Sequence, residues 1–398
     1  MKRALFAVFA AALAAGCATD QRFRKEEGVG PVMTQSQRRG FAEKLAAQLA
    51  AARAGTRILF SEFSDLDYVA DTDSVVNKDG ITVWQAHIGD ARFWGTAIAV
   101  VNGHDIVGSL QVDDRLYAIR TKDDDLIVSE VDQSKFPEEL EPRPHPRIAQ
   151  QLARRSEQAA VTLRVLLVVP PSLSKWCPAP MARLMAHMSE ANVDGVWSRF
   201  TGGAIGSEMS VYCTDHEADS TSLYANLDWV STDAEVQAQR AATQSNMVAF
   251  IIPEASGCGQ SFGNYPVDDP EANTRAFSVV RFDCAWDNYS LAHELGHQLG
   301  MDHDRYTIKG GYTDRCNYGY SFIRDGKPVA RDVMSYSGYC KSLGIDCPRI
   351  GTYSYATTLK DLRLGVSCSV TGDLDPVTGA ASAVDQLLIA APIAATWH

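Results

Sequence analysis

Cysteine is missing from a long part of this 398-residue sequence: none lies between Cys17 and Cys177, and no Cys-x-x-Cys pair occurs anywhere. The absence of such pairs argues against a zinc site built from cysteines. A surplus of basic residues is also missing, because the formal net charge is −12. Nucleic acids and anionic lipid surfaces need a basic partner surface, so we expect neither to bind.

A hydrophobic run long enough to cross a membrane is missing as well. The apolar run at residues 4–15 has only about a dozen residues, follows a basic start and precedes Cys17. This arrangement predicts an export signal over residues 1–17. Residues 13–17, Leu-Ala-Ala-Gly-Cys, resemble the cleavage site of bacterial lipoproteins, which implies lipidation of Cys17 and a place in the cell envelope as an outer-membrane lipoprotein. The leucine stands one position further upstream than usual, so the alternative is ordinary cleavage and secretion.

The cysteines that remain support export. All eight lie after residue 170, and an even number in an oxidising compartment predicts up to four disulfides. Eight cysteines permit 105 pairings, among which the sequence does not choose.

The pattern with the clearest chemistry is His-Glu-Leu-Gly-His-Gln-Leu-Gly-Met-Asp-His at residues 293–303. His293 and His297 are four residues apart, which on a helix places both imidazoles on one face. Gly300 permits a turn that ends the helix and returns His303 to the same point. Three nitrogen ligands leave one position of a zinc ion open for water, and Glu294 is placed to act as the general base.

This pattern resembles the metzincin zinc endopeptidases, in particular their reprolysin-like branch. The resemblance includes a methionine turn, Asp-Val-Met-Ser-Tyr at residues 332–336, and implies that Met334 lies beneath the three imidazoles. It implies that Asp304, directly after the third histidine, stabilises the turn without binding metal. Tyr336 has a counterpart in other branches, where the phenol binds zinc or stabilises the oxyanion.

The sequence predicts two domains. Residues 18–155 include β-type runs at 81–84, 94–101 and 125–128, after one helix around residues 41–49. This β-rich part resembles the propeptide of reprolysin-like proteases, and the alternative is a permanent accessory domain. A propeptide without cysteine would have to cover the zinc with a carboxylate, a histidine or steric bulk.

A boundary is predicted where four prolines stand among charged residues, at 137–146, followed by an Arg-Arg pair at 154–155. We expect an exposed linker that a protease could cut.

Residues 156–398 are predicted to form the catalytic domain, an α/β (α+β) fold with a twisted mixed sheet and long helices. The order is strand 161–169, helix 180–197, strand 209–213, helix 234–244, strand 247–252, strand 276–282 and then the zinc helix, with a final helix at 380–397 interrupted by Pro392. Residues 257–263 are either the sheet edge on which an extended substrate pairs or a turn held by a disulfide.

Residues 340–354 are similar to bacterial reprolysin-like enzymes that include peptidyl-aspartate metallopeptidases. An acidic preference would need a basic pocket. Arg331 and Arg349 could line one, although as loop residues we expect them on the surface.

The predicted function is zinc-dependent hydrolysis of extended protein or peptide substrates, with Glu294 as base. The alternative is an envelope-anchored binding or assembly lipoprotein that retains zinc without turnover.

Overall fold

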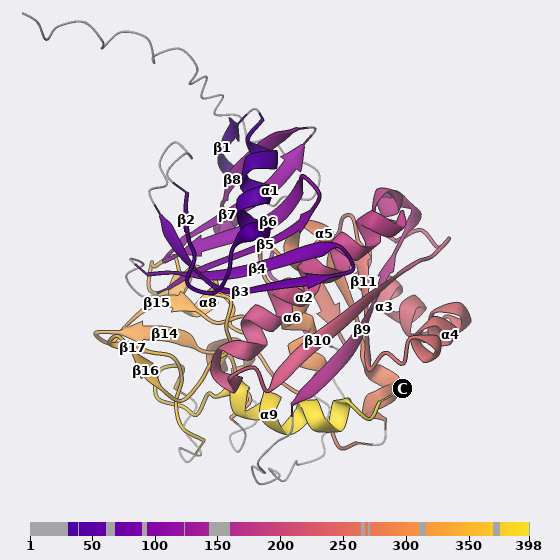
Figure 1. The fold of residues 1–398 in the computed structure, drawn as a ribbon. Helices are drawn as coiled ribbons and strands as arrows, with labels where there is room; N and C mark the ends of the chain where they lie inside the picture. The colour runs from indigo at the N-terminus through magenta and orange to yellow at the C-terminus, as the bar shows by residue number, and fades with distance from the viewer. Residues whose placement is uncertain are drawn as a thin grey trace, which may run out of the picture.

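A computed structural model describes most of the chain, and it shows a mixed α/β protein with several sheets (Figure 1). The export signal, Cys17 and the Arg-Arg pair at 154–155 lie outside the described residues. Within the described part, no helix is both long and apolar enough to cross a membrane. The described residues are 31–38, 40–60, 68–89, 94–122, 124–142, 160–263, 267–269, 271–309, 316–368 and 375–397.

The first sheet is antiparallel and eight-stranded, in the order β1-β8-β7-β6-β5-β4-β3-β2. It confirms the three predicted β-type runs, and α1 (Phe41–Ala51) confirms the predicted helix by burying Leu45 and Leu49. Asp79 and Gly80 both have positive φ and form the tight turn between the third and fourth strands. The strands are β1 (Val32–Arg38), β2 (Arg57–Leu59), β3 (Val69–Lys78), β4 (Ile81–Ile88), β5 (Gly95–Asn102), β6 (Asp105–Val112), β7 (Arg115–Lys122) and β8 (Asp125–Val131).

The second sheet has the order β10-β9-β11-β13-β12, with four parallel strands and an antiparallel strand at one edge. Its central strands are apolar runs buried on both faces, as expected for a parallel sheet covered by helices. The strands are β9 (Val161–Val169), β10 (Ile205–Cys213), β11 (Met247–Ile252), β12 (Gly259–Ser261) and β13 (Phe277–Arg281). The predicted strands at 161–169 and 247–252 are confirmed at both ends.

Helices cover this sheet and join it to the first one. The long α2 (Ala179–Thr201) buries Met185 and Met188 in the core, as predicted, and packs against β4 and β5 of the first sheet. The others are α3 (Leu223–Thr232), which the sequence analysis missed, α4 (Ala234–Ala242), α5 (Phe282–Ala285), α6 (Ser290–Gln298), α7 (Arg305–Ile308) and α8 (Gly338–Ser342), with short 3-10 turns at Gln133–Lys135, Pro171–Trp176 and Ala272–Arg275.

A third sheet, in the order β15-β14-β17-β16, was not predicted. Its strands are too short to show a period in sequence: β14 (Ser321–Arg324), β15 (Lys327–Arg331), β16 (Thr358–Leu359) and β17 (Leu362–Arg363). The final helix α9 (Ala383–Ala394) packs on α2 and β9. The predicted interruption at Pro392 is wrong, because this proline lies in the last turn and the helix continues to Ala394.

Candidate metal centre

The three predicted histidine ligands meet at one point. His293 and His297 lie on one face of α6, and Gly300, with φ of +80°, turns the chain so that His303 approaches from the following loop. The Nε2 atoms are separated by 3.0 Å (His293 to His297), 2.9 Å (His297 to His303) and 3.2 Å (His293 to His303). All three side chains are fully buried.

The outer nitrogen of each imidazole faces an acceptor. Nδ1 of His293 is 2.8 Å from the Val333 carbonyl, and Nδ1 of His297 is 3.0 Å from the Met301 carbonyl. Nδ1 of His303 lies 3.3 Å from Oε2 of Glu141. A proton on each Nδ1 leaves the Nε2 lone pairs facing one another, which is the orientation that metal-ligating histidines adopt.

Burial keeps two of these imidazoles neutral. It lowers the pKa of His293 to about 3 and holds the pKa of His297 well below its usual value. Neutral imidazole is the form that binds a cation. Two nitrogens that share a tetrahedral zinc ion at ~2.05 Å lie roughly 3.3 Å apart, so the observed separations fit such an ion.

Glu294 lies beside these ligands and is completely buried. Neither carboxylate oxygen makes a hydrogen bond of normal geometry within the described structure. Burial raises the pKa of Glu294 well above its usual range, which the nearby Ser261 hydroxyl only partly offsets. A methyl group on Gly259 would come within 2.5 Å of Oε1, so the strand β12 lies directly against this carboxylate.

The other predicted residues surround the histidines. Met334 is fully buried, and its Sδ lies so close to Gly296 of α6 that a Cβ there would be only 2.6 Å away. Oδ2 of Asp304 accepts a hydrogen bond of 2.9 Å from the Tyr336 backbone N–H, so Asp304 stabilises the turn, and it is not among the convergent ligands. The Tyr336 ring lies 4.1 Å from the His303 ring, between centroids.

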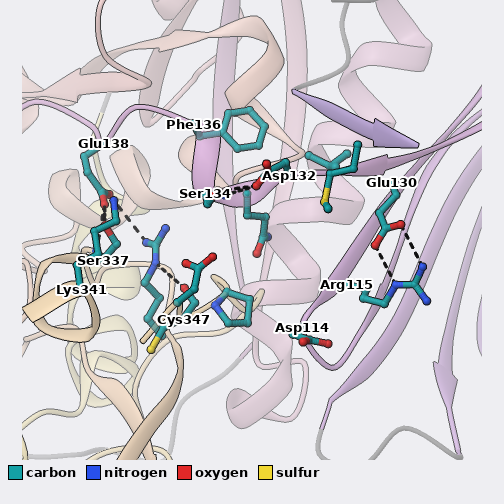
Figure 2. Close-up of a pocket in the computed structure, with 16 residues that line it drawn as sticks. Asp114, Arg115, Glu130, Asp132, Ser134, Phe136, Glu138, Ser337, Lys341 and Cys347 are labelled. Carbon is teal, nitrogen blue, oxygen red and sulfur yellow. Dashed lines mark hydrogen bonds and ion pairs between the residues drawn. The ribbon is translucent and has the colours of Figure 1, made fainter. Parts of the chain in front are cut away.

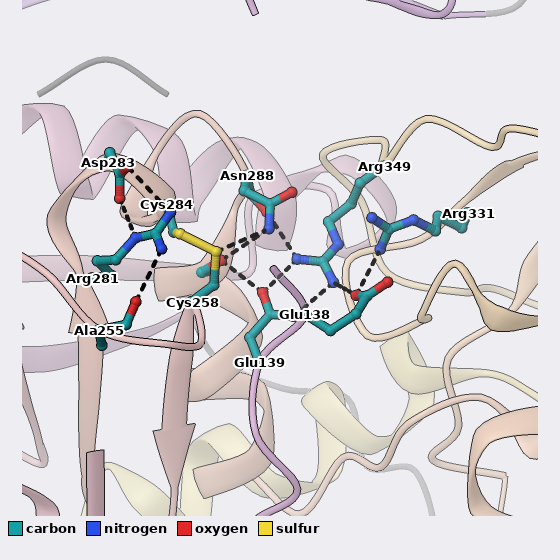
Figure 3. The surroundings of a disulfide bond; sticks show 11 residues. Glu138, Glu139, Ala255, Cys258, Arg281, Asp283, Cys284, Asn288, Arg331 and Arg349 are labelled. Atoms are coloured by element: carbon teal, nitrogen blue, oxygen red, sulfur yellow. Dashed lines mark hydrogen bonds and ion pairs between the residues drawn. A yellow bond between two sulfur atoms is a disulfide. The ribbon is translucent and has the colours of Figure 1, made fainter. Parts of the chain in front are cut away.

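The expectation that Arg331 and Arg349 lie on the surface is wrong. Both are buried, and Nη1 and Nη2 of Arg349 lie 2.5 and 2.9 Å from the two carboxylate oxygens of Glu139 (Figure 3). Nη1 of Arg331 donates to the Ser335 carbonyl at 2.6 Å. Burial alone would raise the pKa of Glu139, but the Arg349 guanidinium more than reverses this and holds it well below its usual range.

The expectation of an exposed linker is wrong for part of residues 137–142, the described part of that region. Glu139 and Pro142 are buried, Glu141 is exposed, and the segment runs beside β12. The Leu140 N–H donates to the Gly259 carbonyl at 2.8 Å, and the Cys258 N–H donates to the Glu138 carbonyl at 3.3 Å. Prolines and charges gave this segment the composition of a linker, but hydrogen bonds with residues 258 and 259 hold it in place.

Residues 257–263 include both an edge strand and a disulfide, while the pairing of a substrate on this edge stays a prediction. β12 is the edge strand, and the Cys258–Cys284 disulfide anchors its start. Nδ2 of Asn288 lies 3.7 Å from Sγ of Cys258, and the carbonyl of Asn288 accepts from Nη1 of Arg349 at 3.0 Å (Figure 3). The edge strand and Arg349 are therefore linked through Asn288. The other disulfides are Cys177–Cys213, Cys316–Cys368 and Cys340–Cys347.

A cavity of about 210 Å³ lies beside Arg331, between the first sheet and the region after the methionine turn (Figure 2). Phe136, Glu138, Arg331 and Cys347 line it, but none of the three histidines does. The cavity is therefore separate from the metal centre and adjoins Glu138 of residues 137–142.

Comparison with known proteins finds distant relatives that are named as metalloendopeptidases. No family model matches the chain. It is 25% identical over 275 and 278 residues to proteins named peptidyl-Asp metalloendopeptidase from Stenotrophomonas maltophilia strains K279a and R551-3, and 24% identical over 279 residues to one of that name from Xanthomonas campestris pv. campestris. Each match covers 65% of this chain and 62% of the relative, so the chain spans less than two thirds of the relatives' length.

The matched relatives are named as metalloendopeptidases, and this chain has three histidines that could together hold a metal ion. Among solved structures, a chain from a chaperone–substrate complex covers 73% of this chain and 39% of its own length, at 15% identity and a TM-score of 0.41. A likeness at that score carries no argument.

Proposed function

We propose that the chain is a zinc-dependent endopeptidase of the metzincin type, reprolysin-like, that hydrolyses extended protein or peptide substrates. The observation that carries the proposal is the convergence of three buried Nε2 atoms beside Glu294, a buried carboxylate without hydrogen bonds of its own. The named relatives support the same reaction. Export, with lipidation of Cys17 or secretion after removal of residues 18–155, remains a prediction.

Different residues of the chain would bind the metal, transfer the proton and stabilise the oxyanion. Bound zinc, held by His293, His297 and His303, would act as a Lewis acid toward a water molecule and the peptide carbonyl. Glu294 then accepts the proton of the attacking water at a carboxylate oxygen and returns it to the leaving amine. Exclusion of water around the buried carboxylate strengthens this proton transfer. The Tyr336 hydroxyl, which donates to a peptide carbonyl in this structure, is placed to stabilise the oxyanion.

We also propose that the enzyme prefers an acidic side chain next to the cleaved bond. Arg349 binds a carboxylate through two parallel N–H···O contacts, the geometry in which arginine recognises carboxylates. The name of the relatives refers to aspartate. A buried arginine needs such a partner, because an unpaired charge in the pocket would be costly.

The test is the variant Glu294→Gln, which preserves shape and removes the base. We expect zinc content, measured by atomic absorption, to remain at one ion per chain, while turnover of an internally quenched peptide containing aspartate falls to background. Retained turnover would contradict the assignment of Glu294 as the general base. Zinc-loaded protein that never cleaves, even after residues 18–155 have been removed, would favour the alternative of a binding or assembly protein.

A further inference from the structure

Residues 138–142 of the chain itself lie beside the metal centre. We propose that residues 138–142 form an inhibitory strand, anchored by Glu139 on Arg349, which occupies the site that an acidic substrate would use. The inference rests on the proposed function, since it assigns a regulator to that same site. It names the group that covers the metal centre in a chain that has no cysteine between Cys17 and Cys177.

The main chain of the segment uses the edge of β12. Besides the Leu140 and Glu138 contacts, Nε2 of Gln260 donates to the Glu141 carbonyl at 3.1 Å. Along the segment, residues 138, 140 and 141 meet residues 258, 259 and 260 in turn, so the segment runs in the same direction as β12. An extended substrate pairs with these same edge groups, so it cannot bind while the segment is in place.

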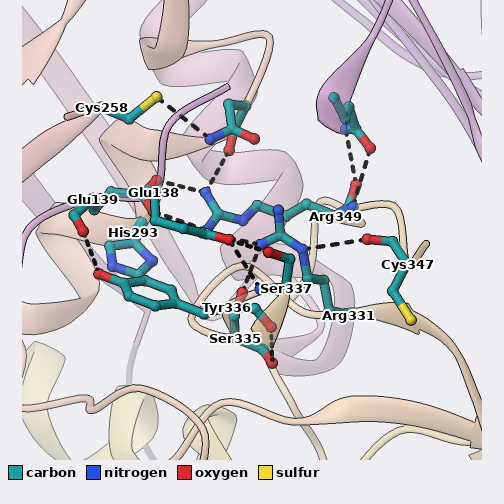
Figure 4. A network of polar contacts seen from close by, with 12 residues as sticks. Glu138, Glu139, Cys258, His293, Arg331, Ser335, Tyr336, Ser337, Cys347 and Arg349 are labelled. Atoms are coloured by element: carbon teal, nitrogen blue, oxygen red, sulfur yellow. Dashed lines mark hydrogen bonds and ion pairs between the residues drawn. The ribbon is translucent and has the colours of Figure 1, made fainter. Parts of the chain in front are cut away.

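The Glu139 side chain is fitted to its pocket. It is fully buried, as is Arg349, and the Ser290 hydroxyl donates to Oε1 at 2.6 Å. Figure 4 shows the two glutamates of the segment among the arginines and the residues after the methionine turn. Burying a charge pair is costly unless hydrogen bonds compensate the lost hydration, and both carboxylate oxygens of Glu139 accept such bonds.

A second glutamate fixes the segment from the other side. Oε1 of Glu138 accepts hydrogen bonds from the Ser337 backbone N–H at 3.0 Å and from the Ser337 hydroxyl at 2.5 Å. Oε2 of Glu138 is 3.6 Å from Nη2 of Arg349. The positive pocket therefore faces two consecutive carboxylates, and the segment is complementary to it in charge.

The segment also reaches the catalytic groups. The Tyr336 hydroxyl donates to the Glu139 carbonyl at 2.7 Å, so it is not free for a substrate. Further along, a Cβ on Gly263 would come within 2.3 Å of Cβ of Pro142 and 3.6 Å of Cβ of His297. The chain thus passes from the arginine pocket across the metal-binding helix, which explains why cover by this segment needs no thiol.

The experiment compares full-length chains that differ only in this anchor. Glu139→Gln keeps the shape and removes the charge, and we expect turnover of an internally quenched aspartate-containing peptide to rise at least about tenfold at equal zinc content. The matched control is Glu130→Gln, because Glu130 also pairs with an arginine through two contacts, 2.9 and 3.0 Å from Arg115, but in the first sheet. We expect the control to match wild type, and thermal unfolding to show both variants folded.

Two further measurements separate this inference from the proposed function. A hydroxamate-capped aspartyl peptide should bind Glu139→Gln at least about tenfold more tightly than wild type in calorimetry, whether or not either chain cleaves anything. A synthetic peptide of residues 136–142 should inhibit the Glu139→Gln chain, and the same peptide with glutamine in place of Glu139 should inhibit at least about tenfold less.

Three results would overturn the inference. The first is equal turnover and equal hydroxamate binding by wild type and Glu139→Gln. The second is equal inhibition by the two peptides. The third is rapid cleavage within residues 138–142 by wild type but not by Glu294→Gln, seen by mass spectrometry, because the segment would then be a substrate. Tighter hydroxamate binding by Glu139→Gln without any turnover would support the inhibitory strand but contradict the proposed peptidase function.

Discussion

Arg349 carries more of the chemistry than its place in the sequence indicates. It stands in a loop between Pro348 and Ile350, where an arginine is ordinarily solvated, yet its side chain is fully buried. The two carboxylates of Glu138 and Glu139 raise its pKa above the usual value, against the effect of burial. It therefore stays charged at any pH at which the protein is folded, as a pocket for an acidic side chain requires.

We predict that Arg349 sets the acidic preference. In the Glu139→Gln background, adding Arg349→Met should lower the ratio of kcat/KM for an aspartate peptide over its alanine analogue by about 10- to 100-fold, because a charge-assisted bidentate contact is lost. Peptide pairs that differ only at that side chain measure this ratio.

Arg331→Met in the same background serves as the comparison. Arg331 is no closer than 4.0 Å to a Glu138 oxygen, so its loss should change the ratio less. An unchanged ratio in the Arg349→Met protein would contradict the pocket.

Among the elements, β12 is the one on which the site depends most closely. It has only three residues, Gly259–Ser261, but it pairs with β13 on one side, lies against Glu294 and pairs with residues 138–142 on the other side. Its first residue must be a glycine because the Glu294 carboxylate occupies the space of a side chain.

We predict that Gly259→Ala displaces the catalytic carboxylate. The new Cβ would stand 2.5 Å from Oε1 and 2.9 Å from Cγ of Glu294, so the side chain must move. In the Glu139→Gln background, kcat should fall at least about tenfold while zinc stays bound, since a displacement of about 1 Å at a catalytic group has large effects on rate. Stopped-flow turnover and zinc content are the measurements.

Gly206→Ala is the matched control. Gly206 lies in β10 of the same sheet, and a Cβ there would meet nothing nearer than 3.9 Å. This variant should keep its activity. Equal kcat in the Gly259→Ala protein would show that the carboxylate tolerates the methyl group.

For the whole molecule, the metal centre joins α6, the loop that carries His303 and the turn of Met334. Three buried imidazoles with facing lone pairs repel one another unless a cation lies between them, so the metal and the fold stabilise each other. Two of the four disulfides, Cys316–Cys368 and Cys340–Cys347, lie in the chain after His303 and hold that region together.

Removal of the metal should therefore lower thermal stability. Free zinc at 1,000 times its Kd stabilises the folded state by about 4 kcal/mol, so dialysis against a chelator should lower Tm by several degrees, and added zinc should restore it. Differential scanning calorimetry measures the shift.

His297→Ala should abolish the zinc-dependent shift, whereas His104→Ala should keep it, because the His104 side chain is 60% exposed and lies outside the metal centre. A Tm that does not respond to zinc would argue against binding at the three histidines.

The sequence by itself determined what depends on local spacing. The interval of four between His293 and His297 and the glycine at position 300 suffice to predict a helix, a turn and convergent ligands, because these follow from the geometry of a single helix and its end. The apolar runs at 161–169 and 247–252 likewise specify buried strands, since only a covered parallel sheet accommodates them.

Only the tertiary structure decided what depends on distant partners. Arg349 meets Glu139 across 210 positions, and Tyr336 meets the same residue across 197. The spacing of apolar residues in the sequence does not predict contacts between such distant positions. Arg349 therefore resembled a surface residue, and residues 137–142 resembled a linker. Arg349 and Glu139 are both buried because each supplies the charge that the other needs, and burial of either alone would be too costly.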